Sequence, residues 1–242
     1  MLNKKTIIII FFSIIVMASA VIFFYFFQNK KVTTSQEAQP STSVPVFLPF
    51  SKDISVNDIN NEKEIQSTFS DYITGESKND IQKIQFKDRQ GQVVSLEKLS
   101  ASIKFNVEPA IKNIVSKNNY SVFSCVGENG KKDFGLIFNI RRFRKDESVD
   151  YGKLYKDTEN KMKNWENSML KDLHSVLFPN VQFSENQLNQ KLEFKDGKYR
   201  FAGLNLPDGS NGSLNYTLLG DPIVISTSVE CMDKAVGNFF DE

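Results

Sequence analysis

The feature that most constrains this chain is an apolar segment near its amino terminus, from Thr6 to Phe27. The segment carries no acidic or basic side chain, and its only polar groups are the hydroxyls of three small residues and one tyrosine. A helix of this length is about 30 Å long, which matches the hydrocarbon thickness of a bilayer. We therefore predict a single transmembrane anchor in contact with lipid, preceded by a short cytoplasmic tail, residues 1–5.

Two alternatives to this topology stay open. Lys4 and Lys5, together with the small residues Ala18-Ser19-Ala20, also fit a cleaved secretory signal. Retention is favoured because the apolar run continues well past Ala20. The lysines on the two sides of the segment nearly balance, but a long domain after a first anchor crosses the membrane largely regardless of charge. This predicts an extracytoplasmic domain at the cell membrane, and a domain tethered on the cytoplasmic side is the alternative.

Composition bounds the rest of the chain. Residues 28–49 are mostly polar and show no periodicity, so we predict a linker. The segment 44–50 at its end is apolar and contains two prolines, which suits an edge strand or an extended segment. Residues 50–242 then form one domain of about two hundred residues, which is enough for a sizeable core. The net charge is +1 with acids and bases interspersed, which excludes the clustered basic excess of a nucleic-acid-binding domain.

The secondary-structure signals predict an α+β fold with an antiparallel, hairpin-rich sheet packed by one long helix and shorter helices. The long helix is expected from Tyr151 to Leu177, because apolar residues recur there at steps of three and four and Asp150 can cap it. A capping box from Thr227 to Glu230 predicts a last helix with Val229 and Met232 facing inward. Shorter helices are predicted over 57–74, over 96–103 with Ser95 as cap, and over 110–116 after Pro109.

Turn signals supply the predicted strands. Asn129-Gly130 predicts a hairpin between strands 120–126 and 134–142, and the second of these should be central because both of its faces are apolar. Asp196-Gly197 and Gly220-Asp221 predict two further hairpins. In the first hairpin, the predicted register places Phe194 opposite Tyr199, Leu192 opposite Phe201 and Glu193 opposite Arg200. In the second, it places Tyr216 opposite Ile225 and Leu218 opposite Ile223. A further strand pair is expected within 80–94, around a turn at 88–91.

Residues that could carry chemistry are few. The single histidine, His174, removes most metal and catalytic-triad arrangements, so we predict no catalytic, cofactor-binding or metal-binding residue. A partly buried histidine held by a backbone or carboxylate group is favoured over a thiol–imidazole pair with Cys125. Carboxylates such as Glu166, Asp172 and Glu193 leave one enzymatic alternative open, an anchored extracytoplasmic hydrolase that uses carboxylates near His174.

The two cysteines, Cys125 and Cys231, allow one disulfide outside the cytoplasm or two separate buried thiols, and sequence spacing does not decide between them. A bridge would close a loop worth about 4 to 5 kcal/mol in the chain-entropy model. If it were free, Cys231 would lie at a helix start and be a candidate reactive thiol. A basic run at 141–145 is followed at once by two acids, which favours a solvated strand end over binding to an anionic polymer or lipid headgroups.

Three segments carry a resemblance. In chain order they are Ser95-Leu96-Glu97-Lys98-Leu99, the segment from Trp165 to Leu173, and Leu214-Asn215-Tyr216 with Ile225-Ser226-Thr227-Ser228. They resemble uncharacterised single-pass membrane-anchored proteins of candidate-phylum bacteria with reduced genomes. The resemblance implies a bacterial envelope setting and brings no catalytic residue with it. We therefore expect a binding or assembly protein of the cell envelope, with an envelope protein or another ligand as partner and no cofactor.

Overall fold

The computed structural model describes residues 51–75, 81–127, 130–140 and 150–237, all within one compact unit, Thr42–Glu242. The predicted anchor (6–27), the linker (28–49), the extended segment at its end (44–50) and the basic run (141–145) lie outside these residues. Within the described part, no helix has both the length and the apolar character needed to span a bilayer. The described residues form an α+β fold with a seven-stranded sheet and seven helices.

The strands are β1 (Ser51–Ser55), β2 (Ile81–Lys87), β3 (Val115–Val126), β4 (Lys132–Ile140), β5 (Arg200–Asn205), β6 (Asn211–Leu218) and β7 (Pro222–Ser226). They lie in the order β1-β2-β3-β4-β7-β6-β5, so β4 is the central strand, as predicted. All neighbours pair antiparallel except β1 and β2, which run parallel. The expectation of a purely antiparallel sheet is therefore wrong, because a helical crossover between β1 and β2 turns the chain back in the same direction.

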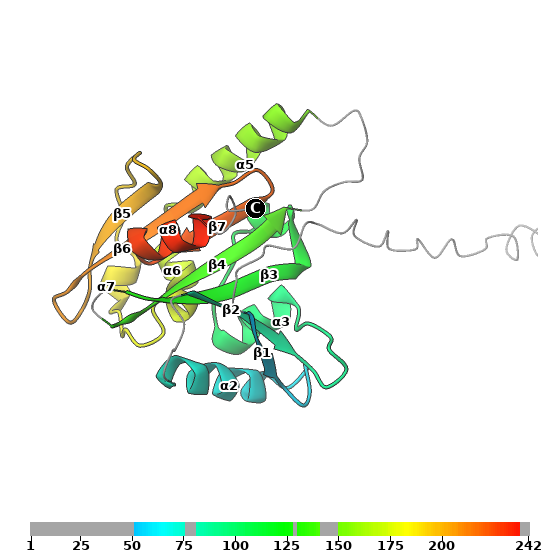
Figure 1. Cartoon of the computed structure of the whole chain (residues 1–242). Helices are drawn as coiled ribbons and strands as arrows, with labels where there is room; N and C mark the ends of the chain where they lie inside the picture. The colour runs from blue at the N-terminus through cyan, green and yellow to red at the C-terminus, as the bar shows by residue number, and fades with distance from the viewer. Residues whose placement is uncertain (1–50, 76–80, 128–129, 141–149, 238–242) are drawn as a thin grey trace, which may run out of the picture. The chain divides into compact units, whose positions relative to one another are not determined.

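The helices are α2 (Glu62–Thr74), α3 (Leu96–Ile103), α4 (Pro109–Lys112), α5 (Tyr151–Trp165), α6 (Met169–Leu177), α7 (Glu185–Leu188) and α8 (Val229–Gly237). Helices α2 to α6 pack on one face of the sheet around a large core, and α8 covers the other face (Figure 1). Successive side chains of a strand point to opposite faces. On β4, Leu136 and Phe138 therefore enter the large core, while Ile137 packs in the smaller cluster with Met232 of α8.

Several local predictions are confirmed. Helix α3 has the predicted bounds, and the Ser95 side chain accepts a hydrogen bond from Lys98 N. The β3–β4 hairpin turns at Gly130, whose φ of +72° is readily adopted by glycine. The β6–β7 hairpin has the predicted register, with Tyr216 opposite Ile225. In each case a short stretch of sequence contains the whole signal.

The prediction of one long helix from Tyr151 to Leu177 is wrong, because α5 ends at Trp165 and α6 begins at Met169. At the break, the Trp165 Nε1 and Ser168 Oγ groups both donate to Asp172 Oδ2, at 2.9 Å and 2.7 Å. Hydrogen bonds of a serine side chain compete with continuous helix. Trp165 and Met169, on either side of the break, are both fully buried in the same core.

The predicted hairpin at Asp196-Gly197 is also wrong. Strand β5 pairs along its length with β6, so Phe201 lies opposite Asn215, and only an isolated bridge joins Lys195 to Phe201. The bridge places Lys195, not the predicted Leu192, opposite Phe201, while the other edge of β5 forms six residue pairs with β6. The residues that join β5 to β6 form a turn with Gly209 at φ +79°.

Three smaller corrections concern element ends. The second strand expected within 80–94 is reduced to one bridge, between Lys87 and Val93. The helix predicted over 110–116 corresponds to α4, which ends at Lys112 because β3 already begins at Val115. The predicted capping box does not form. Ser228 Oγ, not the Thr227 side chain, accepts from a first-turn amide of α8, and Val229 is 45% exposed instead of inward-facing. Thr227 has other partners, which the next section describes.

Candidate functional site

The two cysteines are joined: Cys125 Sγ and Cys231 Sγ lie 2.07 Å apart in a disulfide. The bridge connects the end of β3 to the first turn of α8, and both residues are 1% exposed. Of the two alternatives left open by the sequence, the structure therefore has the bridge. A Cys125–His174 nucleophile pair has no thiol to deprotonate, and the same holds for a reactive Cys231.

His174 is a partly buried residue held by its surroundings, as predicted. Its Nδ1 atom lies 2.8 Å from the Lys171 carbonyl oxygen, and its ring meets the Phe183 ring edge-on. Neither Glu166 nor Asp172 is among its hydrogen-bond partners in the described part of the chain. The histidine therefore stabilises the end of α6 and does not meet a carboxylate there.

Glu166 instead belongs to an ion-pair cluster between α5 and the sheet. Arg200 donates to both carboxylate oxygens of Glu166, through Nε at 2.7 Å and through Nη2 at 3.1 Å. The Tyr216 hydroxyl donates to the same carboxylate at 2.7 Å. The side chains of Glu166 and Arg200 are 12% and 21% exposed. The pKa of Tyr216 is raised, mainly by burial and secondly by its hydrogen bond to Glu166. The hydrogen bond to the same carboxylate also raises the pKa of Arg200. With both pKa values raised, Tyr216 keeps its proton and Arg200 its charge around neutral pH, which suits a structural role more than proton transfer.

The remaining predicted residues do not complete a site. Asp172 accepts from Trp165 and Ser168 at the helix break, and Glu193 is exposed. Among the described residues, no group of three or more histidine, cysteine, aspartate or glutamate side chains is placed to hold a metal ion. The sequence-predicted candidates are therefore spread over separate structural roles.

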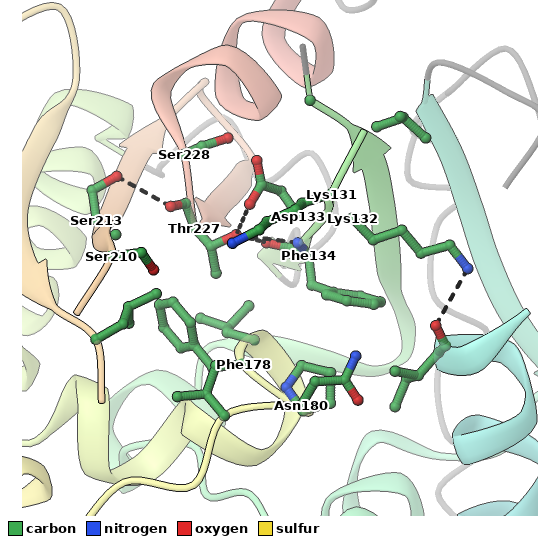
Figure 2. Close-up of a pocket in the computed structure, with 18 of the residues that line it drawn as sticks. Lys131, Lys132, Asp133, Phe134, Phe178, Asn180, Ser210, Ser213, Thr227 and Ser228 are labelled. Carbon is green, nitrogen blue, oxygen red and sulfur yellow. Dashed lines mark hydrogen bonds between the residues drawn. The ribbon is translucent and has the colours of Figure 1, made fainter. Parts of the chain in front are cut away.

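A groove of about 1110 Å³ at one end of the sheet has the character of a binding site (Figure 2). Its walls come from the end of β3, the starts of β4 and β6, the residues after β7, and the chain that follows α6. Apolar side chains such as Phe134, Phe178 and Leu206 line part of it, and hydroxyl, amide and charged groups line the rest. An apolar surface with a few polar groups is typical of ligand sites.

The groove exists because β7 is shorter than both of its neighbours. Ser226, the last residue of β7, lies opposite Gly135 on β4 and opposite Asn215 on β6. Both neighbours extend past this point, β4 by three residues to Lys132 and β6 by four residues to Asn211. The chain then leaves the sheet to enter α8, so the strand position between β4 and β6 is not filled by β7 at this end.

Thr227 closes the inner end of the groove. Its backbone N–H donates to Phe134 O at 3.1 Å, and its hydroxyl accepts from Phe134 N at 3.2 Å and lies 3.2 Å from Asp133 Oδ1. On the other side, its carbonyl accepts from Ser213 N at 3.3 Å and Ser213 Oγ at 3.1 Å. Thr227 thus bridges β4 and β6, as the dashed contacts in Figure 2 show.

Next to this bridge is an unusual buried amide. Asn215 is fully buried, and its Nδ2 donates to Ser213 Oγ at 2.8 Å and Ser226 O at 3.3 Å. Its Oδ1 has no hydrogen-bond partner among the described residues. Buried acceptors are nearly always satisfied, so this orphan next to the groove points to a bound water or another donor.

Charges around the groove are mixed. Lys131, Asp133, Asp208 and Glu230 all line it. The Lys132 ammonium donates to Tyr72 O at 3.0 Å and to Ile73 O at 3.4 Å at the end of α2. A surface with both signs interspersed selects weakly for net charge, so shape and hydrogen bonding must carry recognition.

Sequence reasoning missed this groove. Its lining comes from segments as far apart as residues 73 and 230. The one local signal was Pro207-Asp208-Gly209, a turn sequence that would have placed a hairpin at 206–210 and so the start of β6. Comparison with protein-family models, with curated proteins and with solved structures found no match to this chain.

Proposed function

We propose that this chain is a binding or assembly protein of the bacterial cell envelope, held at the membrane through residues 6–27, with the domain 50–242 outside the cytoplasm. The disulfide supports this compartment, since such bridges persist in oxidising surroundings and are rare in the cytosol. As a flexible chain, the 28–49 linker would span about 25 Å, enough to present the domain to a partner near the membrane surface.

The groove at the end of the sheet is the observation that carries the binding role. It combines apolar surface with hydrogen-bonding groups on a rigid sheet. The alternative, an anchored hydrolase using carboxylates near His174, is less well supported because Glu166 and Asp172 are engaged in structural hydrogen bonds. An enzyme would have to break these bonds to free either carboxylate.

Two experiments test the proposal. In the first, cells are fractionated and protease is added to intact spheroplasts. The full-length chain should be in the membrane fraction, its carboxyl-terminal part should be digested from outside, and its cysteines should react with maleimide only after reduction and unfolding. A chain recovered as a soluble species, or protected from the protease, would overturn the location.

The second experiment tests the groove. A benzophenone amino acid is placed at Ser210, which lines the groove, and as a control at Lys156, which is exposed on α5 and outside it. After irradiation of membranes, the Ser210 variant should give a discrete cross-linked product that the Lys156 variant does not give. Identical product patterns from both positions would count against the groove as the binding site.

A further inference from the structure

The groove has the geometry of a missing strand segment. Strands β4 and β6 are both hydrogen-bonded to β7, so they lie about 9.5 Å apart, twice the spacing between neighbouring strands. Past Ser226 this width is no longer filled by β7, although both flanking strands continue. A single extended main chain fits that width and can hydrogen-bond to both flanking strands, which a sugar ring, a nucleotide base or a lipid tail cannot do as a strand does.

From this geometry, and resting on the proposed function, we infer that the groove binds an extended peptide segment of a partner protein. The segment adds to the sheet as a short strand that continues the line of β7 between β4 and β6. The space beyond Thr227 accommodates roughly two or three residues of strand. Strand addition of this kind gains affinity from main-chain hydrogen bonds and specificity from alternate side chains.

The main chain of β6 is oriented for such pairing. In an antiparallel ladder, alternate residues direct N–H and C=O to one neighbour and the residues between them to the other. Ser213 N donates toward β7, to Thr227 O, so two residues earlier Asn211 directs its N–H and C=O to the same side, into the groove. Among the described residues, no main-chain hydrogen bond reaches Asn211 from that side. Asn211 therefore offers one donor and one acceptor to an incoming strand.

The two faces of the groove predict the side-chain pattern of the peptide. One face carries apolar residues of the large core and its edge, among them Phe178 and Leu206. The other face lies at the first turn of α8, where Ser228 and Glu230 line the groove. Because strand side chains alternate between faces, the bound segment should alternate apolar and polar residues. The mixed charge of the rim fits a peptide without a strong net charge.

The test uses a library of linear twelve-residue peptides displayed on phage, selected against the purified full-length chain. Recovered peptides are synthesised, and each backbone nitrogen is methylated in turn, which deletes one N–H without changing a side chain. Loss of one main-chain hydrogen bond at a strand should weaken binding by about tenfold. We expect this loss at alternate positions over a short stretch, with little effect at the positions between them.

A pair of proline variants locates the interaction. Asn211→Pro removes the N–H that faces the groove and spares the β5–β6 ladder, since Asn205 and Asn211 form a pair that is not hydrogen-bonded. Asn205→Pro is the matched control, because its N–H faces the outer edge of β5. Asn211→Pro should weaken peptide binding about tenfold and Asn205→Pro should leave it unchanged. Melting temperature and disulfide content check that both variants fold, and the methylation scan on the unmodified chain needs neither of them.

The outcomes separate this inference from the proposed function. Alternating sensitivity to methylation together with loss in Asn211→Pro supports strand addition. Peptides that bind the groove without alternation, or a selection that recovers no peptide, overturn strand addition. In both of those cases the cross-linking at Ser210 still decides whether the groove binds a ligand, so the proposed function stands or falls separately.

Discussion

Reduction of the disulfide provides the sharpest test of how this domain is held together. The bridge joins residues 106 positions apart, and both sulfurs lie in the smaller cluster between the sheet and α8. In the chain-entropy model, a loop of this length restricts the unfolded chain by about 4.8 kcal/mol at 25 °C. Residual structure in the unfolded chain lowers this figure, so we expect reduction to cost about 3 to 5 kcal/mol. A typical domain has only about 5 to 15 kcal/mol of total stability, so the loss should be large.

The assay is urea unfolding of the oxidised and reduced protein, followed by tryptophan fluorescence. Trp165 is the only tryptophan and is fully buried, so its emission reports loss of the core. With an m-value of about 2 kcal/mol per molar urea, the midpoint should fall by about 2 M on reduction. In a thermal scan the expected drop is about 6 to 20 °C for a chain of this size.

The control is the double variant Cys125→Ala/Cys231→Ala, whose midpoint should not respond to the reductant. If the oxidised and reduced wild-type proteins unfold at the same urea concentration, the reasoning fails. Mass spectrometry of the untreated protein then shows which step is wrong. An intact bridge would refute the loop-entropy estimate, and two free thiols would refute the bridge together with the compartment it supports.

Three further predictions, on Gly135, Lys132 and Tyr120, use the same unfolding assay. In Gly135→Ala the new methyl would overlap the Phe123 ring and lie 2.6 Å from Ile225 O, so stability should fall by about 3 kcal/mol or more. The control is Gly203→Ala, whose methyl would meet no atom within 4 Å and which should be nearly neutral. Lys132→Met removes the ammonium that caps the last carbonyls of α2 and should cost about 1 kcal/mol. Burial raises the pKa of Tyr120 above its usual value of about 10, so above pH 10 the folded state keeps a proton that the unfolded state loses. This residue alone should lower stability by about 1.4 kcal/mol per pH unit above pH 10, and other tyrosines with a raised pKa, such as Tyr216, add to the fall. Tyr120→Phe should lose about 1 kcal/mol at neutral pH and show a shallower fall above pH 10.

The parts of the fold that the sequence predicted well are those whose causes are local. Ser95 caps α3 through an amide three residues away, and the β6–β7 hairpin follows from a turn and alternating apolar residues. The helix break at Ser168 is a different case. The apolar stripe continues in phase across it, so periodicity alone does not reveal it, and the hydrogen bonds to Asp172 that stabilise the break depend on tertiary placement.

The hairpin predicted at Asp196-Gly197 shows the limit of a local turn signal. Asp196-Gly197 is a good turn, and the expected partners included an opposite-charge pair, Glu193 with Arg200. In the structure Arg200 binds Glu166 as well as Asp196 of the turn itself, and its strand pairs with β6. Glu166 and β6 lie outside the local window, so residues 192–201 alone could not reveal these two partners.

The candidate site was the least predictable part because it results from a difference in strand length. Nothing in residues 222–228 indicates that β4 and β6 will extend further than β7, since that depends on the registers of two separate ladders. The chain leaves the sheet after Thr227, whose hydroxyl and carbonyl complete the bonding of both neighbours, and enters a helix fixed to β3 by the disulfide. With the path of the chain held on both sides in this way, α8 is not free to extend β7. The unfilled strand position is therefore a stable part of the fold, as a binding site requires.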